Sequence, residues 1–191
     1  MIGVDPRAVV LVEGISDRVA VETLAGRHGR NLDAERVSVV PIGGAQAIGR
    51  FLTQFGPAGL DVRLAGLCDV AEEVNFRRGL ERTGFGSDLT RADMERLGFY
   101  VCVADLEDEL IRALDADEVE RVVAAHGDLG PFRTLQKQPA WHGRPKEEQL
   151  RRFMGSGGRR KTRYARFLVE ALELDRVPRP LDLVLRHVRS R

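Results

Sequence analysis

The sequence predicts an α/β fold: a parallel four-stranded sheet flanked by helices and followed by a basic helical C-terminal region. Short apolar runs alternate with amphipathic segments in the first half, which is typical of parallel sheets with right-handed crossovers. Beyond about residue 105 the strand pattern disappears and only helical periodicity continues. The 191 residues, 43% of them hydrophobic, suffice for one domain with a buried core. We therefore expect an α/β core at residues 5–115 and a helical extension packed on it at residues 116–191.

Each predicted strand is a short apolar run that ends at a glycine, a proline or an acidic residue. The first run is continuous and rich in valine, the pattern of a strand buried on both faces, and Glu13-Gly14 ends it. Gly43-Gly44 follows the second run as a tight turn. The predicted strands are residues 8–12, 37–41, 60–68 and 99–104.

The predicted helices have recognisable starts and stops. Ser16 is the expected N-cap of the first helix, which Gly29 ends. Thr90 and Asp93 have the spacing of a capping box. Further helices are predicted around residues 48–52 and at 71–82, 106–113, 118–125, 147–153, 162–174 and 181–188.

The net charge of +1 conceals an uneven distribution. Residues 1–130 carry 14 Arg and no Lys against 23 Asp and Glu, a net charge of −9. Residues 131–191 carry 16 Arg and Lys against 6 acids, a net charge of +10. An acidic site beside a basic surface would suit a polyanionic partner, although such asymmetry also arises without function.

Several classes of protein are excluded by composition. No apolar run approaches the roughly 20 residues of a membrane span, so no membrane partner is expected. The N-terminus lacks the apolar region of a secretory signal. Two cysteines, Cys68 and Cys102, do not make a disulfide framework and are expected to be buried thiols. These features predict a cytoplasmic protein.

Acidic residues follow three of the predicted strands. Glu13 follows the first, Asp69 the third, and Asp105 and Glu107 the fourth, while Asp17 lies in the first turn after Glu13. Ligands of parallel sheets bind at the carboxyl ends of the strands, and clustered carboxylates suit Mg²⁺ or Mn²⁺. The alternative is that Asp69 and Asp105 only cap the helices that follow them.

Two motifs resemble those of the Toprim domain. Residues 10–17 (VLVEGISD) resemble its first motif, and residues 66–69 (GLCD) lie where that family has an Asp-x-Asp motif. More narrowly, the chain resembles the Toprim half of the OLD-family (overcoming lysogenization defect) endonucleases from about residue 8 to 168. Further segments support this resemblance: residues 41–44 (PIGG), 105–110 (DLEDEL) and 160–165 (RKTRYA). It implies a Toprim-like sheet and an Mg²⁺- or Mn²⁺-dependent endonuclease, a hydrolase of phosphodiester bonds.

The resemblance also implies roles for single residues. Glu13 matches a glutamate linked to metal binding or general acid–base work, and Lys161 matches a lysine near the cleavage site. Lys161 would stabilise charge on the phosphate, or it is simply one solvated cation of a basic helix. The implied metal ligands are Glu13, Asp17, Asp69, Glu72 and Glu107. The implied nucleic-acid-binding residues are Arg159, Arg160, Lys161 and Arg163, in a basic turn that leads into a helix.

The chain departs from the family pattern in two ways. The second aspartate of the Asp-x-Asp motif falls on Ala71, which cannot ligate a metal, so Glu72 or Glu73 would have to substitute. No Gly-x-x-x-x-Gly-Lys-Ser/Thr loop occurs, so no ATP site is expected and any ATPase would be encoded separately.

Three functions remain open on the sequence. The first is a nuclease, with DNA favoured over RNA as its substrate. The second is a non-catalytic nucleic-acid-binding or scaffold module that partners an ATPase, and the third is a Toprim ribonuclease that processes structured RNA. A homodimer is compatible with each. Trp141, the only tryptophan, lies among cations and amides in residues 136–144; it either stacks a base or anchors a loop.

Overall fold

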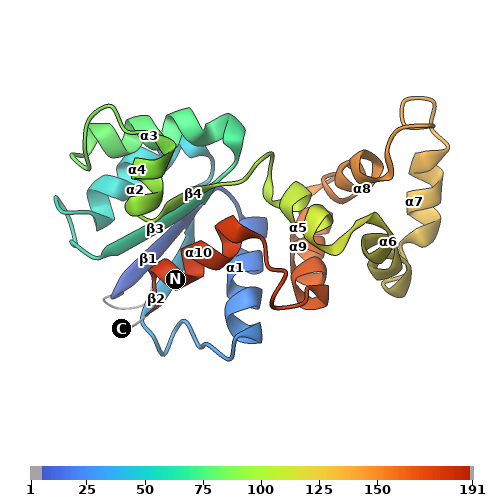
Figure 1. Ribbon diagram of the computed structural model, residues 1–191, viewed down its shortest axis with the longest axis horizontal. Helices are drawn as coiled ribbons and strands as arrows, with labels where there is room; N and C mark the ends of the chain where they lie inside the picture. Colours follow the sequence, from blue (N-terminus) through green and yellow to red (C-terminus); the bar gives the residue numbers. More distant parts are fainter. Residues whose placement is uncertain (1–5, 190–191) are drawn as a thin grey trace.

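The computed structural model describes residues 6–189 and contains the predicted parallel sheet (Figure 1). Strand β1 (Ala8–Val12) pairs with β2 (Val37–Pro41) on one side and with β3 (Arg63–Cys68) on the other. Strand β4 (Phe99–Val101) pairs with β3, so the order is β2-β1-β3-β4, and every pairing is parallel. The predicted fold class is therefore confirmed.

The register of the strands aligns their carboxyl ends. Val12 lies opposite both Pro41 and Leu67, and Cys68 lies opposite Val101. The residues that follow β1, β2 and β3 therefore meet at one edge of the sheet. This edge is where parallel sheets bind ligands.

Apolar side chains cover both faces of the sheet, which is why β1 is a continuous hydrophobic run. On one face Val10 and Val12 pack in a cluster with α1 (Ile15–Arg27) and α10 (Arg179–His187). On the other face Val9 and Leu11 pack with α2 (Ile48–Phe55), α3 (Glu73–Arg82) and α4 (Arg91–Arg96). Short 3-10 turns, η1 (Ala45–Ala47) and η2 (Val70–Glu72), precede α2 and α3.

Five consecutive helices follow the sheet. They are α5 (Leu106–Leu114), α6 (Ala116–Ala125), α7 (Leu129–Gln136), α8 (Lys146–Met154) and α9 (Gly158–Ala171). Helices α6, α7 and α8, which we call the helical lobe, project to one side of the sheet, whereas α9 returns to pack along α1 (Figure 1). One apolar cluster continues from the sheet into this region through Phe132, Phe153 and Tyr164. The division at residue 115 stays a prediction, and residues 5, 190 and 191 of the predicted regions lie outside the described residues.

Three predicted boundaries were wrong and one helix was not predicted, each for a local reason. The third strand begins at Arg63 because the amides of Leu60 and Val62 donate to the end of α2. The fourth ends at Val101, and the amide of Val103 donates to the Glu109 carboxylate 2.7 Å away instead. Helix α7 was not predicted because it contains Gly130-Pro131, although proline is tolerated in a first helical turn. Helix α9 begins at Gly158, so Arg159 to Lys161 are helical rather than part of a turn.

Other predictions of local structure are confirmed. Thr90 and Asp93 form a capping box, with each side chain accepting from the other residue's amide. Cys68 and Cys102 are buried free thiols, and burial raises the pKa of both. Within residues 6–189 no helix is both long enough and apolar enough to cross a membrane.

Gly66 provides a test of the packing between β3 and its neighbours. A β-carbon at this position would lie 2.4 Å from Cδ1 of Phe99 and 3.3 Å from the carbonyl oxygen of Leu11. We expect Gly66→Ala to lower the free energy of unfolding by about 1–3 kcal/mol through overpacking, measured by urea denaturation. Gly26→Ala is the matched control: a β-carbon there meets no atom within 4 Å, so this variant should be unchanged or slightly more stable. Equal stability of the two variants would contradict the packing.

Candidate active site

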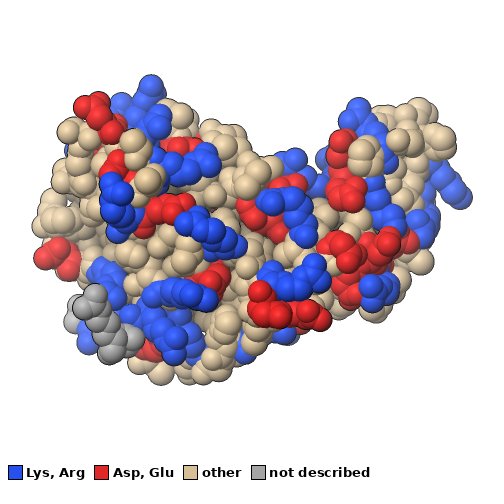
Figure 2. Space-filling view, in the orientation of Figure 1, with Lys and Arg blue, Asp and Glu red and all other residues tan. Residues whose placement is uncertain are grey.

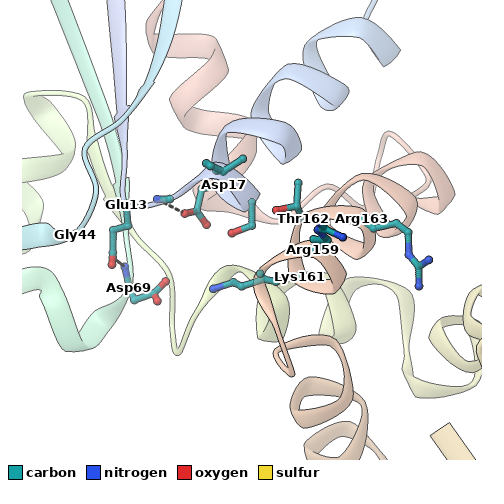
Figure 3. Close-up of a pocket in the computed structure, with 12 residues that line it drawn as sticks. Glu13, Asp17, Gly44, Asp69, Arg159, Lys161, Thr162 and Arg163 are labelled. Carbon is teal, nitrogen blue, oxygen red and sulfur yellow. Dashed lines mark hydrogen bonds between the residues drawn. The ribbon is translucent and has the colours of Figure 1, made fainter. Parts of the chain in front are cut away.

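A cleft of about 740 Å³ opens where β1 and β3 end and α9 begins (Figure 3). Glu13, Asp17 and Asp69 line its sheet side, and Arg159, Lys161 and Arg163 line its α9 side. In Figure 3 the Lys161 side chain extends toward Asp69, whereas that of Arg163 points away from the carboxylates. The cleft therefore brings buried and partly buried acids close to a lysine that lies about 90 residues beyond Asp69 in sequence.

Glu13 joins the ends of three strands. Its carboxylate oxygen Oε1 accepts a 2.7 Å hydrogen bond from the amide of Asp69, which follows β3. Its carbonyl oxygen accepts from the amides of Gly43 and Gly44, which follow β2, at 3.2 and 3.3 Å. Both glycines have positive φ, 76° and 112°, so the predicted tight turn is confirmed and glycine is favoured there.

Asp17 starts helix α1 and lies at the edge of the cleft. Its Oδ2 accepts from the amide of Gly14 at 2.8 Å, and Gly14 is the N-cap residue. The prediction that Ser16 caps the helix was wrong, because the Asp17 carboxylate satisfies the free amide at that end. Asp17 is only 9% exposed, so its charge is held close to the cleft and away from bulk solvent.

Glu107 lies on the first turn of α5 and is 4% exposed. Its Oε2 forms an ion pair with Nζ of Lys161 at 3.3 Å. Its Oε1 is buried and has no hydrogen-bond partner among the described residues. An unpaired buried carboxylate oxygen is costly, so this atom is an open position for a proton, a water molecule or a cation.

The pKa values of all four carboxyl groups are raised. Burial is the largest cause, and it raises the pKa of Asp69 and of Glu107 to about 7. Burial also raises the pKa of Glu13 and Asp17, and repulsion from neighbouring carboxylates adds to the effect. Burial alone would lower the pKa of Lys161, but the nearby carboxylates outweigh it and the net shift is upward. Lys161 therefore stays cationic and supplies part of the charge that these acids require.

The donor chemistry of these residues fits a divalent cation, but the side chains are not arranged around one. Carboxylate oxygens are the ligands that Mg²⁺ and Mn²⁺ prefer. Within the described part of the chain, however, no three His, Cys, Asp or Glu side chains converge as a ready metal cluster. The unpaired Oε1 of Glu107 and the mutual repulsion of the acids are the features that favour a cation here.

The two strand-end aspartates differ in their environments. The Asp105 carboxylate caps α5 by accepting from the amide of Asp108 at 2.8 Å, and Nε of Arg151 donates to it at 2.7 Å. For Asp105 the capping interpretation is confirmed. Asp69 precedes η2, but its side chain makes no cap hydrogen bond, so capping does not explain Asp69.

Glu72, Glu73 and Ala71 lie on the exposed turn after Asp69. Glu72 accepts a 2.6 Å hydrogen bond from Asn75, and Glu73 pairs with Arg91. The charge of Glu72 contributes to the raised pKa of Glu13, so Glu72 lies near the cleft without lining it. Each glutamate thus already has a partner, Asn75 or Arg91, and the substitution of either for the missing aspartate stays a prediction.

The predicted basic residues are divided between the cleft and the helical lobe. Arg160 donates to Oγ of Ser156 at 2.6 Å and lies over the ring of Phe153, away from the cleft. Arg163 lines the cleft edge but pairs with Asp128. Asp128 and Arg151, which neutralise groups beside the site, were missed because their partners lie 35 and 46 residues away in sequence.

Comparisons with known proteins agree with the fold. Residues 6–70 match the family described as "Overcoming lysogenization defect protein-like, TOPRIM domain". The C-terminal region of the OLD protein of Xanthomonas campestris pv. campestris is similar in structure, with a TM-score of 0.72 and 24% identity over 96% of this chain and 94% of that one. The C-terminal region of the Burkholderia pseudomallei OLD protein also has a TM-score of 0.72, with 20% identity over 96% and 97%. Comparison with curated proteins gave no match.

The raised pKa of Asp69 predicts how stability depends on pH in metal-free buffer. A carboxyl group whose pKa rises from about 4 to about 7 on folding stabilises the fold below its unfolded pKa. That contribution is lost as the pH rises through 7, because the folded protein must then hold a buried charge. We expect Asp69→Asn to lose less stability than the wild type between pH 5 and 8, measured by thermal melting.

Asp175→Asn is the control for this measurement, because Asp175 is exposed in the turn before α10. Its melting temperature should follow the wild-type pH curve. If Asp69→Asn reproduces the wild-type curve over the whole range, the raised pKa of Asp69 is contradicted.

Proposed function

We propose that this chain, which has an OLD-like Toprim segment and the fold of the OLD C-terminal region, is a metal-dependent nuclease that hydrolyses DNA phosphodiester bonds. Toprim domains of this type are generally a metal-dependent nuclease fold. The observation that carries the proposal is the cleft at the carboxyl edge of the sheet that Glu13, Asp17, Asp69 and Lys161 line, with Glu107 paired to Lys161. Metal-dependent hydrolysis of a phosphodiester requires carboxylates that hold the metal ion and, beside them, a positive charge that contacts the phosphate.

In this proposal Asp17, Asp69 and Glu107 would hold Mg²⁺ or Mn²⁺, with Glu13 as a further ligand or as the general base. When bound, the metal supplies Lewis-acid stabilisation of the phosphate and a water molecule of lowered pKa. Glu13 is suited to accept a proton, because its pKa is raised while its hydrogen bond to the Asp69 amide fixes its position.

Lys161 contributes charge to the phosphate side of the reaction. Its side chain is half-buried and its Nζ lies 3.3 Å from Oε2 of Glu107, so the ammonium group lies between the acids and the solvent. A cation at that boundary stabilises the negative charge that builds on phosphate oxygens as the bond is attacked. Arg159, in the same turn of α9, would hold the neighbouring phosphate by charge alone.

Ala71 supports a second candidate function, a nucleic-acid-binding module that does not cut. The family's second aspartate is missing there, and Glu72 is engaged by Asn75. A site short of one ligand would bind a second metal weakly. The two candidates agree on nucleic acid as partner and differ in whether a bond is broken.

We further propose an ATPase as a partner of this chain. The similar structures are described as C-terminal regions of OLD proteins, and the sequence of this chain contains no Gly-x-x-x-x-Gly-Lys-Ser/Thr loop. ATP should therefore have no direct effect on the reaction of this chain alone.

Lys161→Ala tests the nuclease directly. We expect wild-type protein with Mg²⁺ or Mn²⁺ to nick plasmid DNA, and a chelator to abolish the reaction. Lys161→Ala should lower the cleavage rate about 10²-fold or more, because it removes a charge that acts on the transition state. Lys137→Ala is the matched control: it removes an exposed lysine at the end of α7 and should leave the rate unchanged.

If the wild type cuts neither plasmid, single-stranded DNA nor RNA with either metal, the nuclease proposal fails and the binding module takes its place. Equal loss in the Lys161 and Lys137 variants would place the effect in bulk charge rather than in the cleft.

Restoring the aspartate tests the role of Ala71. Ala71 is exposed on the turn after Asp69, so Ala71→Asp should fold normally. We expect it to raise the cleavage rate and to tighten Mn²⁺ binding measured by calorimetry, since an added carboxylate supplies a ligand for a second cation. Val70→Asp places the same charge one residue away and is the control. If Ala71→Asp and Val70→Asp both cleave DNA at the wild-type rate, the missing carboxylate at position 71 does not limit the cleavage rate.

A further inference from the structure

A second cleft, of about 510 Å³, lies on the other side of the Lys161–Glu107 ion pair. Its lining includes Trp141, Arg151, Arg152, Asp105 and Glu107, and it shares Lys161 with the first cleft. Figure 2 shows the molecule hollowed between the body that contains the sheet and the helical lobe, with basic and acidic side chains at the base of the hollow. We call this second space the Trp141 cleft.

Trp141 is the only tryptophan of the chain, and its ring does not pack in the hydrophobic core of the described residues. It is partly buried, yet among the described residues it belongs to neither apolar cluster. The guanidinium carbons of Arg144 and Arg152 lie 5.2 and 6.0 Å from its ring centroid. Aromatic rings flanked by arginines are the elements with which proteins hold single-stranded nucleic acid.

The loop that carries Trp141 is fixed by Gln149 rather than by the indole ring. Gln149 is 6% exposed on α8, and its Nε2 donates to the carbonyl of Trp141 at 2.8 Å. Its Oε1 accepts from Gln136 of α7 at 2.7 Å, so one buried amide joins both helices to the loop. The backbone at Trp141 is therefore held in place by these hydrogen bonds, while the ring contacts the guanidinium groups of Arg144 and Arg152.

Three of the four cations beside Trp141 are already paired. Arg151 pairs with Asp105, Lys161 with Glu107, and Arg144 with Glu148. Arg152 is exposed and forms no ion pair with any residue between 6 and 189. It is thus the charge left for an anionic ligand that enters the cleft.

We propose that the Trp141 cleft binds one unpaired nucleotide, with its base stacked on Trp141 and a phosphate against Arg152. This inference rests on the proposed function, because the shared Lys161 places that nucleotide next to the phosphate to be cut. A base inside a duplex is stacked on its neighbours and cannot reach the ring. The substrate is therefore a strand that is single or splayed open at the cleavage position.

The intrinsic fluorescence of the full chain reports on this cleft, because Trp141 is the only tryptophan. In buffer with a chelator, so that nothing is cut, single-stranded DNA of 12 nucleotides should quench the fluorescence. The same sequence as a duplex should bind with little quenching. Single-stranded RNA of the same sequence, measured in parallel, shows whether the cleft distinguishes ribose from deoxyribose.

Variants of the cleft residues test the same binding through its affinity. Trp141→Leu should weaken binding of labelled single-stranded DNA roughly 10-fold, measured by anisotropy, and leave duplex binding unchanged. Trp141→Phe should keep most of the affinity because it keeps an aromatic face. Arg152→Gln should weaken single-strand binding, whereas Arg96→Gln, which removes a charge from distant α4, should not. With the wild type, one abasic position in the strand should reproduce the Trp141→Leu loss.

Each outcome bears on one proposal or the other. Single-stranded DNA that binds without quenching, or with equal affinity for wild type and Trp141→Leu, overturns the stacking cleft and leaves the nuclease standing. Equal quenching by duplex and single strand overturns the requirement for an unpaired base. Quenching and a Trp141-dependent affinity without cleavage in Mg²⁺ or Mn²⁺ support the cleft and refute the nuclease. Failure to bind any of these nucleic acids overturns both.

Discussion

Repulsion among buried carboxylates at one edge of the parallel sheet is the constraint on which the other parts of this structure depend. Strands that run in the same direction end together, so Glu13 and Asp69 meet through a 2.7 Å hydrogen bond. Asp17 and Glu107 lie nearby on the helices that follow β1 and β4. Burial and mutual repulsion raise the pKa of each carboxyl group, and an arrangement of this kind persists only beside positive charge.

That charge comes from α9, which explains why the C-terminal helices are packed as they are. Arg27 of α1 donates to the carbonyl of Val169 at 2.8 Å and also to that of Leu172, and so holds the end of α9 against α1. The hydroxyl of Tyr164 donates to Asp128 at 2.9 Å, which ties α9 to the helical lobe. These contacts fix the position of α9, whose first turn lines the cleft beside the acids with Gly158, Arg159 and Lys161. A helix N-terminus and its cations also favour a phosphate.

The sequence predicted the elements whose surroundings are uniform and missed those that depend on distant partners. The run from Ala8 to Val12 was recognisable because both faces of β1 are buried. Asp69 and Asp105 could not be told apart, since both precede helical turns. Only Asp105 caps its helix, and only the packing of α8 on α5 brings Arg151 to it. Lys161 was found through its motif, yet its position in a helix rather than a turn depends on tertiary contacts of α9.

The raised pKa values also determine whether these carboxylates hold protons or cations near neutral pH. Asp69 and Glu107 have pKa values of about 7, so near neutral pH a proton and a divalent cation compete for the same oxygens. Lys161 already occupies one side of Glu107 and must share that carboxylate with any metal. One lysine balances only one of these four carboxylates, so the site accepts further positive charge. Lys161 lines both the first cleft and the Trp141 cleft, and it is therefore the group that links them.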